Sequence, residues 1–469
     1  MAAGSGKRYD VIIVGAGPAG IFAALELKER APHLRVLIIE KGRDIEERTC
    51  PSKEKTIACT HCSPCSITCG WGGAGAFSDG KLTLSTQVGG MLDSFLGEEQ
   101  LAELIKYVDG IYLNFGAPNK VYGLEKEDAL AELQRQAVLA ELKLIPAPIR
   151  HLGTGRTQTI LARMKEHLLS EGVEIITCRA VSRILTAGKE VVGVETREGE
   201  SFSCRYLIVA PGREGSEWLV GEASRLGLEM AVNPVDIGVR VELPAAVMQH
   251  ITDVIYEGKF IFHSHTFEDK VRTFCMNPYG EVVAENNDGI VTVNGHTHAH
   301  RKTENTNFAI LVSKTFTEPF KEPIAYGKYV ARLANLLGGG VIVQRLGDLL
   351  AGRRSTYERL SKGVVEPTLK EATPGDLSLV FPYRHLLAII EMLQALDRIA
   401  PGVYSRHTLL YGVEAKFYSS RLKLTRELET QVKSMFAVGD GAGITRGLAQ
   451  ASVAGVVAAR AIANREKGK

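Results

Sequence analysis

The sequence has little net charge and no long apolar run, and both absences restrict what the protein can be. Lysine and arginine number 56 against 54 aspartate and glutamate residues, so the formal net charge is only +2 at pH 7. A balance this even creates no strong field for nucleic acid or an anionic membrane. No uninterrupted apolar run approaches the roughly 18 to 20 residues of a membrane span. We therefore expect a cytoplasmic protein with no nucleic-acid partner and no membrane span.

Signal-peptide and repeat features are also missing. The apolar stretch at residues 11–25 follows Asp10 and is interrupted by glycine and proline, which is typical of a strand followed by a helix. The chain has no internal repeat and no long low-complexity linker. Its 469 residues are enough for two or three domains with large cores.

A glycine-rich motif stands near the start of the chain. Val11–Val14 predict a buried strand, and Gly15, Gly17 and Gly20 follow it before an apolar helix. In a dinucleotide-binding loop the first glycine permits a tight turn and the second lets the backbone approach a pyrophosphate. The third lets helix and strand pack closely. Glu40 ends the next predicted strand, about twenty residues later, where an acid suits a ribose hydroxyl. The order of these parts predicts dinucleotide binding.

Two further motifs indicate that the dinucleotide is FAD. Ser434–Val438 predict a short strand, followed by the Gly-Asp-Gly-Ala-Gly run at 439–443 and an alanine-rich helix over 447–464. This unit resembles the second flavin motif of two-dinucleotide-fold flavoproteins. The resemblance implies that Asp440 contacts the ribityl chain and that the helix start faces the pyrimidine edge of the flavin. Residues 206–213 resemble the central strand and turn of the same family.

Five of the eight cysteines lie within one short segment. Such density in a cytosolic chain favours a metal site over disulfides. The last four have the spacing C-x2-C-x2-C-x3-C of a ferredoxin-type run, which predicts a [4Fe–4S] cluster. Gly70 follows the run where a ferredoxin has proline, so the fourth ligand stays open. The predicted metal ligands are four of Cys50, Cys59, Cys62, Cys65 and Cys69, with Cys59, Cys62 and Cys65 joined by Cys50 or Cys69.

Two other readings of the cysteines remain open. A structural zinc site normally uses two C-x2-C pairs separated by a longer spacer, which this run lacks. A redox disulfide such as Cys65–Cys69 would use only two of the five thiols. The segment runs directly into a glycine-rich stretch at 70–82. In the flavoprotein family that loop passes over the pyrophosphate and the flavin ring, so the resemblance implies a metal centre near the flavin that accepts single electrons.

The predicted elements indicate an α/β fold, with a Rossmann-like FAD-binding domain of discontinuous segments and an inserted α+β substrate domain built on an antiparallel sheet. Strand-like runs between residues 235 and 313 form that sheet, and Cys178, Cys204 and Cys275 are expected in cores. The expected boundaries are 1–89 for the first FAD-binding segment with the cysteines, 90–150 for a helical insertion, 151–214 for the second FAD-binding segment, 215–425 for the substrate domain and 426–469 for the last FAD-binding segment.

Across nearly its whole length the chain resembles the bacterial and archaeal FAD-dependent dehydrogenases of unassigned substrate, which are related more distantly to geranylgeranyl reductases. The resemblance lies in Gly15–Gly20, Gly72–Lys81, Arg272–Gly280 and Gly439–Gly441. It implies FAD and an oxidoreductase activity, and it names no substrate. The cofactor-binding residues that the motifs and the resemblance predict are Gly15, Gly17, Pro18, Ala19, Gly20, Glu40, Lys41, Gly72, Gly73, Ala74, Ser78, Asp79, Lys81, Pro211, Gly212, Gly439, Asp440, Gly443 and Ile444.

Catalytic residues are harder to assign. Tyr383, Tyr411 and Lys416 are candidates because their side chains can protonate a substrate, although a core or pocket-wall role fits them equally. Three histidines alternate along the sequence at His296, His298 and His300, a spacing that would place them on one face of a strand as possible metal ligands. Their polar neighbours instead favour an exposed hairpin edge. No second strand–glycine loop–helix unit is available for NAD(P)H, since the glycines at 338–340 precede a strand.

The sequence therefore predicts an FAD-dependent oxidoreductase with a [4Fe–4S] cluster. We expect hydride or electron exchange with a small organic substrate, such as one with an electron-poor double bond, and a one-electron donor such as ferredoxin. One alternative is a tRNA-modifying flavoprotein, which shares the first motif, although the near-neutral charge argues against it. The other is an electron-transfer or redox-sensing module without a substrate of its own.

Overall fold

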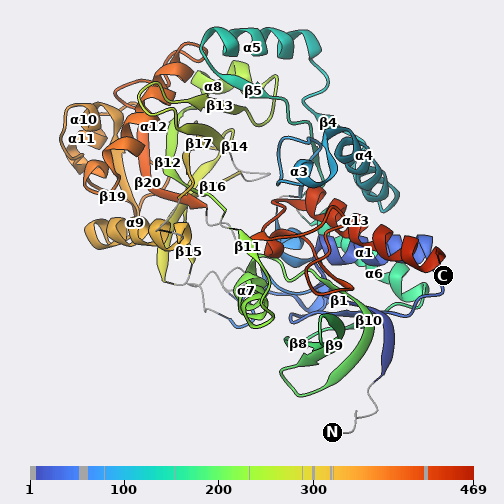
Figure 1. Ribbon diagram of the computed structural model, residues 1–469. Coiled ribbons are helices and arrows are strands. Elements are labelled where there is room, and N and C mark those ends of the chain that lie inside the picture. Colours follow the sequence, from blue (N-terminus) through green and yellow to red (C-terminus); the bar gives the residue numbers. More distant parts are fainter. Residues whose placement is uncertain are drawn as a thin grey trace. The chain divides into compact units, whose positions relative to one another are not determined.

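The computed structural model describes residues 7–51, 62–78, 80–153, 155–231, 233–287, 289–297, 302–316, 320, 322–416 and 421–468. The chain forms two compact units, each made of separate stretches of sequence (Figure 1). Unit 1 comprises Met1–Val121, Ile149–Ala231 and Ser419–Lys469, and unit 2 comprises Tyr122–Pro148 and Val232–Tyr418. The second unit is thus inserted into the first, as the sequence predicts.

Unit 1 is built on a seven-stranded mixed sheet. Its centre is β1 (Arg8–Val14), which pairs in parallel with β2 (Val36–Ile39) on one side and β10 (Ser201–Val209) on the other. β7 (Glu174–Ile176) pairs with β2, and β22 (Met435–Ala437) pairs with β10, both in parallel. β1, β2 and β10 are almost continuously apolar because both faces of a parallel sheet are covered. This arrangement confirms the predicted Rossmann-like α/β fold.

Two helices pack closely beside this sheet. α1 (Pro18–Arg30) follows β1, and α13 (Leu448–Lys467) ends the chain; they lie side by side in Figure 1. Gly455 permits the contact, because a β-carbon there would lie 2.0 Å from the carbonyl oxygen of Ala19. The other elements of unit 1 are β3 (Lys81–Thr83), α3 (Asp93–Leu96), α4 (Glu98–Asn114), β6 (Ile149–His151), α6 (Arg156–Ser170), β8 (Val181–Ala187), β9 (Glu190–Thr196), α7 (Ser216–Arg225), β11 (Met230–Ala231) and β21 (Arg421–Leu422), with short 3₁₀ turns at Ile45–Glu47, Gly73–Phe77, Arg213–Gly215 and Asp440–Ala442.

Unit 2 is built on an eight-stranded sheet in the order β19-β18-β20-β12-β17-β14-β13-β5. Its central strand β12 pairs antiparallel with β17 and β20, as in Val239 opposite Ile310. Among the described strands of this sheet only β18 and β19 pair in parallel, so the inserted unit is built on a mainly antiparallel sheet, as predicted. The strands are β5 (Lys143–Ile145), β12 (Val235–Pro244), β13 (Lys259–His263), β14 (Lys270–Asn277), β17 (Asn305–Lys314), β18 (Ile342–Arg345), β19 (Thr373–Pro374) and β20 (Leu409–Lys416).

Helices cover this sheet, and a separate two-stranded hairpin packs against it. Within the described residues, β15 (Glu281–Asn287) and β16 (Ile290–His296) pair with each other and with no other strand. The sequence predicts that both belong to the main sheet, and this prediction is wrong. The helices are α5 (Glu127–Leu139), α8 (Ala245–Thr252), α9 (Pro323–Gly338), α10 (Leu346–Leu350), α11 (Tyr357–Ser361) and α12 (Tyr383–Asp397), with a 3₁₀ turn at Leu377–Leu379; β4 (Val121–Tyr122) lies where the chain passes from unit 1 to unit 2.

The structure corrects the expected domain boundaries. Residues 90–150 do not form a helical insertion of their own, because α4 buries Leu101 and Val108 in the core of unit 1 and α5 buries Leu133 in the core of unit 2. The inserted unit begins near 232 instead of 215, since the buried side chains of α7 belong to the core of unit 1. Cys178, expected in a core, is exposed. No helix in the described ranges is long and apolar enough to cross a membrane.

Candidate functional site

The loop between β1 and α1 leaves open space at one glycine and none at its neighbours. A β-carbon on Gly15 would lie 2.2 Å from the carbonyl oxygen of Ala210, and one on Gly20 would lie 2.0 Å from that of Gly15. A β-carbon on Gly17 would meet none of the described residues within 4 Å. Gly15 and Gly20 are therefore required by the packing of the protein itself. Gly17 borders space that a ligand can occupy.

The start of α1 also suits an anionic ligand. Pro18 begins the helix, and none of the described side chains caps it. The first N–H groups of a helix have no partner within the helix, and the helix dipole adds roughly half a positive charge there. A phosphate beside Gly17 would meet these N–H groups, which is the arrangement that the glycine spacing predicts.

Glu40 joins three loops at this edge of the sheet. Its side chain is 5% exposed. One carboxylate oxygen accepts a hydrogen bond from the Ala16 N–H at 2.8 Å, and the other accepts from Gly42 at 2.8 Å and Gly70 at 2.9 Å. The sequence motif predicts that this carboxylate binds a ribose hydroxyl. The structure shows a further role, because the carboxylate holds the first glycine loop against the segment that carries the cysteines.

The glycine-rich stretch after the cysteines lies against the first loop. Gly72 donates its N–H to the carbonyl of Ala16 at 2.8 Å. A β-carbon on Gly73 would lie 3.1 Å from the Cα of Gly17. Ser78 donates its hydroxyl to the carbonyl of Gly75 and closes the turn. Of the other residues predicted here, Ala74 lies within the same 3₁₀ turn, Lys81 begins β3, and Asp79 lies outside the described residues.

The C-terminal glycine motif lies beside the start of α1, next to the loop between β1 and α1. Gly439 has a φ of 79°, and a β-carbon there would lie 3.2 Å from the Cβ of Ala19. A β-carbon on Gly441 would lie 2.5 Å from the carbonyl oxygen of Gly212 and 2.8 Å from the ring of Pro211. The predicted residues of four separate segments, around 15–20, 72–78, 211–212 and 439–444, therefore converge on one edge of the sheet.

Asp440 begins the 3₁₀ turn of this motif with a partly buried carboxyl group. Burial raises its pKa. Thr445 donates its hydroxyl to one carboxylate oxygen at 2.8 Å, and the Arg213 guanidinium lies 3.9 Å from the other. Ile444, also predicted, is buried, and its carbonyl accepts the N–H of Met91 at 2.9 Å. Lys41 pairs at 4.0 Å with Glu214.

Arg48 fixes the segment between the cysteines and the glycine loop. Its buried guanidinium donates to the carbonyl oxygens of Ser66, Ile67 and Trp71, at 2.9, 2.8 and 2.6 Å. Burial lowers its pKa to about 10. Sequence reasoning missed this residue, because a single arginine before a cysteine carries no recognisable pattern. The contact gives the cysteine segment a defined position beside the glycine loop.

The cysteines show no metal-ligand arrangement in the part of the chain that is described. Cys59 lies outside that part; Cys62 is exposed, Cys50 and Cys65 are half-buried, and Cys69 is buried. Across the described ranges, no three His, Cys, Asp or Glu side chains are grouped as metal ligands would be.

Cys65 and Cys69 lie one helical turn apart. The N–H of Cys69 donates to the carbonyl of Cys65 at 2.9 Å. Burial acts to raise the pKa of the Cys65 thiol, but the N–H groups of Thr68 and Ile67 stabilise the thiolate and the net pKa is lowered. Burial raises the pKa of the Cys69 thiol.

The three catalytic candidates lie in unit 2 in different surroundings. Tyr383 is 72% exposed at the start of α12. Tyr411 is fully buried, and its hydroxyl donates to Glu242, whose pKa is raised by burial. Lys416 ends β20 with its ammonium 2.9 Å from Glu414, which also pairs with the fully buried Arg240. The structure does not bring the three side chains together as one site, and of the three Tyr411 is closed off within the unit.

Comparison with known families agrees with both units. Residues 10–49, which contain β1, α1, β2 and Glu40, match the family described as FAD binding domain. Residues 234–417 match the family described as FAD-dependent protein, C-terminal domain-like, and this range coincides with the inserted part of unit 2. The chain is an FAD-dependent flavoprotein. Because flavin chemistry transfers hydride and electrons, it is an oxidoreductase.

Individual relatives are distant. An uncharacterised protein of Clostridium beijerinckii is 28% identical, over 96% of this chain and 80% of its own length. Among solved structures, formate oxidase of Aspergillus oryzae has a TM-score of 0.46 at 13% identity, covering 99% of this chain and 100% of its own. A 3-ketosteroid dehydrogenase of Rhodococcus jostii has a TM-score of 0.45 at 13% identity, covering 97% of each chain. Similarities this low identify no substrate.

Proposed function

We propose that the four converging loops of unit 1 hold FAD non-covalently, and that the protein exchanges hydride or electrons with a small organic substrate. The observation that carries the proposal is the open space beside Gly17 at an uncapped helix start, surrounded by the other predicted motif residues. Bound FAD supplies two-electron chemistry at its flavin ring. A substrate with an electron-poor double bond suits that chemistry.

The residues of the chain have separable tasks in this proposal. The N–H groups at the start of α1 bind the pyrophosphate, and Gly17 keeps the approach free of a side chain. Glu40 orders the loop and accepts a ribose hydroxyl with its remaining lone pairs, since a carboxylate has about four acceptor positions. Asp440 would accept hydrogen bonds from the ribityl chain, and the turn at 443–444 would help to hold the flavin.

The test is the flavin content of Gly17→Val. The backbone at Gly17 is extended, with a φ of −78°, so valine is tolerated by the backbone and fills only the open space. We expect the purified variant to retain little or no FAD. Gly221→Val is the matched control, because a β-carbon there also meets nothing within 4 Å and the residue lies in α7. A full flavin spectrum in Gly17→Val would refute the site.

A [4Fe–4S] cluster is a second, separable proposal that rests on cysteine spacing. Four of Cys50, Cys59, Cys62, Cys65 and Cys69 would be its ligands, and it would supply one-electron transfer from a donor such as ferredoxin. Zinc is the alternative. We expect anaerobically purified protein to contain iron and sulfide, and each of the Cys59→Ser, Cys62→Ser and Cys65→Ser variants to lose both. Comparing the metal content of the Cys50→Ser and Cys69→Ser variants then identifies the fourth ligand, because only the variant that lacks the true ligand should lose its iron. Zinc without iron would reject the cluster, and normal metal content in all five variants would reject a cysteine metal site.

A further inference from the structure

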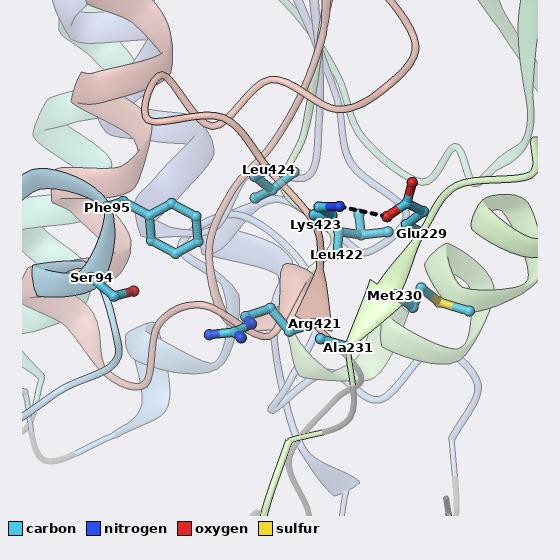
Figure 2. Close-up of a pocket in the computed structure, with 9 residues that line it drawn as sticks. All are labelled: Ser94, Phe95, Glu229, Met230, Ala231, Arg421, Leu422, Lys423 and Leu424. Carbon is cyan, nitrogen blue, oxygen red and sulfur yellow. Dashed lines mark hydrogen bonds and ion pairs between the residues drawn. The ribbon is translucent and has the colours of Figure 1, made fainter.

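A cavity of about 320 Å³ lies within unit 1, between the paired strands β11 and β21 and the short helix α3. Its volume is at the lower end of the range for small-molecule sites. Figure 2 shows the side chains that line it. They are Ser94, Phe95, Glu229, Met230, Ala231, Arg421, Leu422, Lys423 and Leu424.

The charges of the lining leave one cation available. Lys423 and Glu229 pair at 2.8 Å, so their charges offset each other. The Arg421 guanidinium pairs with no carboxylate among the described residues, and its only hydrogen bond there is to the thioether sulfur of Met91, at 3.6 Å. Figure 2 shows its guanidinium extending from β21 toward Ser94 and Phe95, away from the Lys423–Glu229 pair. The cavity therefore carries a net positive charge at one end.

Apart from Ser94, the rest of the lining is apolar. Phe95 faces the cavity, and Arg426 donates to its carbonyl oxygen at 3.1 Å. Leu422 is buried, and Met230 opposes it across the two-stranded sheet. A ligand with an apolar or aromatic body would contact these side chains while its acidic end met the guanidinium.

We propose that this cavity binds a small organic carboxylate with an apolar or aromatic body. The planar guanidinium of Arg421 presents two parallel N–H donors, which matches a carboxylate in a bidentate pair. Phe95 and the apolar side chains beside it contact the body of the ligand. The site is separate from the pyrophosphate loop, so it does not depend on the proposed role of Gly17.

The cavity is nevertheless connected to the C-terminal glycine motif. Met91, which accepts from Arg421, donates its N–H to the carbonyl of Ile444, and Gly90 pairs with Thr445. Residues 444–445 directly follow the Asp440 turn. Met91 therefore links Arg421, the proposed carboxylate-binding residue, to the loop that we propose to hold the flavin.

Binding of benzoate, phenylacetate and hexanoate to the purified, flavin-containing protein tests the proposal by calorimetry. Benzamide tests the requirement for charge, and acetate and inorganic phosphate test the requirement for an apolar body. We expect at least one of the three acids to bind, and benzamide, acetate and phosphate to bind more weakly. A charge-assisted bidentate pair predicts that Arg421→Gln weakens binding by about tenfold or more. The affinity of Arg421→Lys should lie between those of the wild type and Arg421→Gln. Phe95→Leu should weaken the binding of benzoate more than that of hexanoate.

Arg197→Gln, at an exposed arginine of the same unit, is the control and should bind as the wild type does. Should Arg421→Gln fail to fold, the Arg421→Lys and Phe95→Leu variants decide the question. The proposal is overturned if none of the three acids binds, or if Arg421→Lys and Phe95→Leu both bind benzoate as tightly as the wild type. Phosphate or acetate binding as tightly as benzoate would also reject it, because the apolar lining would then contribute nothing.

Discussion

Replacing His385 by methionine should make the protein less sensitive to acid. His385 lies near the start of α12, its side chain is 3% exposed, and neither ring nitrogen has a hydrogen-bond partner among the described residues. Its pKa is lowered from 6.5 to about 4, mainly by burial and next by the nearby ammonium of Lys314. Asp269 acts in the opposite direction and Arg384 adds a small lowering effect. The imidazole is therefore neutral in the folded protein at pH values where the unfolded chain is protonated.

The magnitude follows from these two pKa values. Because the folded-state pKa is depressed, the contribution to stability is complete above about pH 6.5 and is lost as the pH falls toward 4. A difference of about 2.5 units corresponds to about 3 kcal/mol in full, at 1.36 kcal/mol per unit. Between pH 7.5 and pH 5 the expected loss from this one group is about 2 kcal/mol.

Urea unfolding of the wild type and His385→Met at the two pH values measures this loss. Circular dichroism is the suitable probe, since both tryptophans, Trp71 and Trp218, belong to unit 1. Buried carboxylates also respond to acid, so the quantity of interest is the difference between the two proteins. His263→Met, at an exposed position of the same unit, should keep the wild-type pH dependence. If His385→Met loses as much stability as the wild type on acidification, the buried imidazole is not the cause.

Two further predictions concern the buried ion pair and the electron donor. Glu414→Gln leaves the fully buried Arg240 without its charged partner, and the loss of one member of a buried pair predicts about 3–5 kcal/mol of destabilisation in urea unfolding. The exposed pair of Glu358 and Lys362 is the control, and Glu358→Gln should cost less than about 1 kcal/mol. Because the sequence has no second dinucleotide motif, reduced methyl viologen should bleach the flavin faster than NADH in stopped-flow traces; fast, saturable bleaching by NADH would contradict this.

The glycine loops could be predicted from the sequence because their constraints are local. Gly15 and Gly20 are required because a β-carbon at either position would clash with the backbone. The spacing of these glycines after an apolar strand therefore indicates the loop geometry directly. The parallel strands were recognisable for a similar reason, since strands covered on both faces read as continuous apolar runs. The C-terminal Gly-Asp motif added the order of elements that distinguishes FAD from other dinucleotides.

The division of residues 90–150 between the units could not be predicted in the same way. The helical spacing of apolar residues in α4 and α5 shows that each helix has a buried face. It does not show which core covers that face, because the partner residues are far away in the sequence. The same limit applies to Arg421, a single arginine whose significance depends on Phe95 being brought beside it.

The contacts of Glu40 show why the sequence motif predicted only part of the role of this residue. A motif assigns the acid at the end of the second strand to a ribose, whereas here both carboxylate oxygens accept backbone N–H groups from three loops. Removing that carboxylate would leave three buried donors without acceptors, each costing about 1–3 kcal/mol. One of these donors belongs to Gly70, so the position of the cysteine segment depends on the same side chain as the dinucleotide loop. Any contact of Glu40 with a ribose is therefore added to a structural role that connects the two motifs.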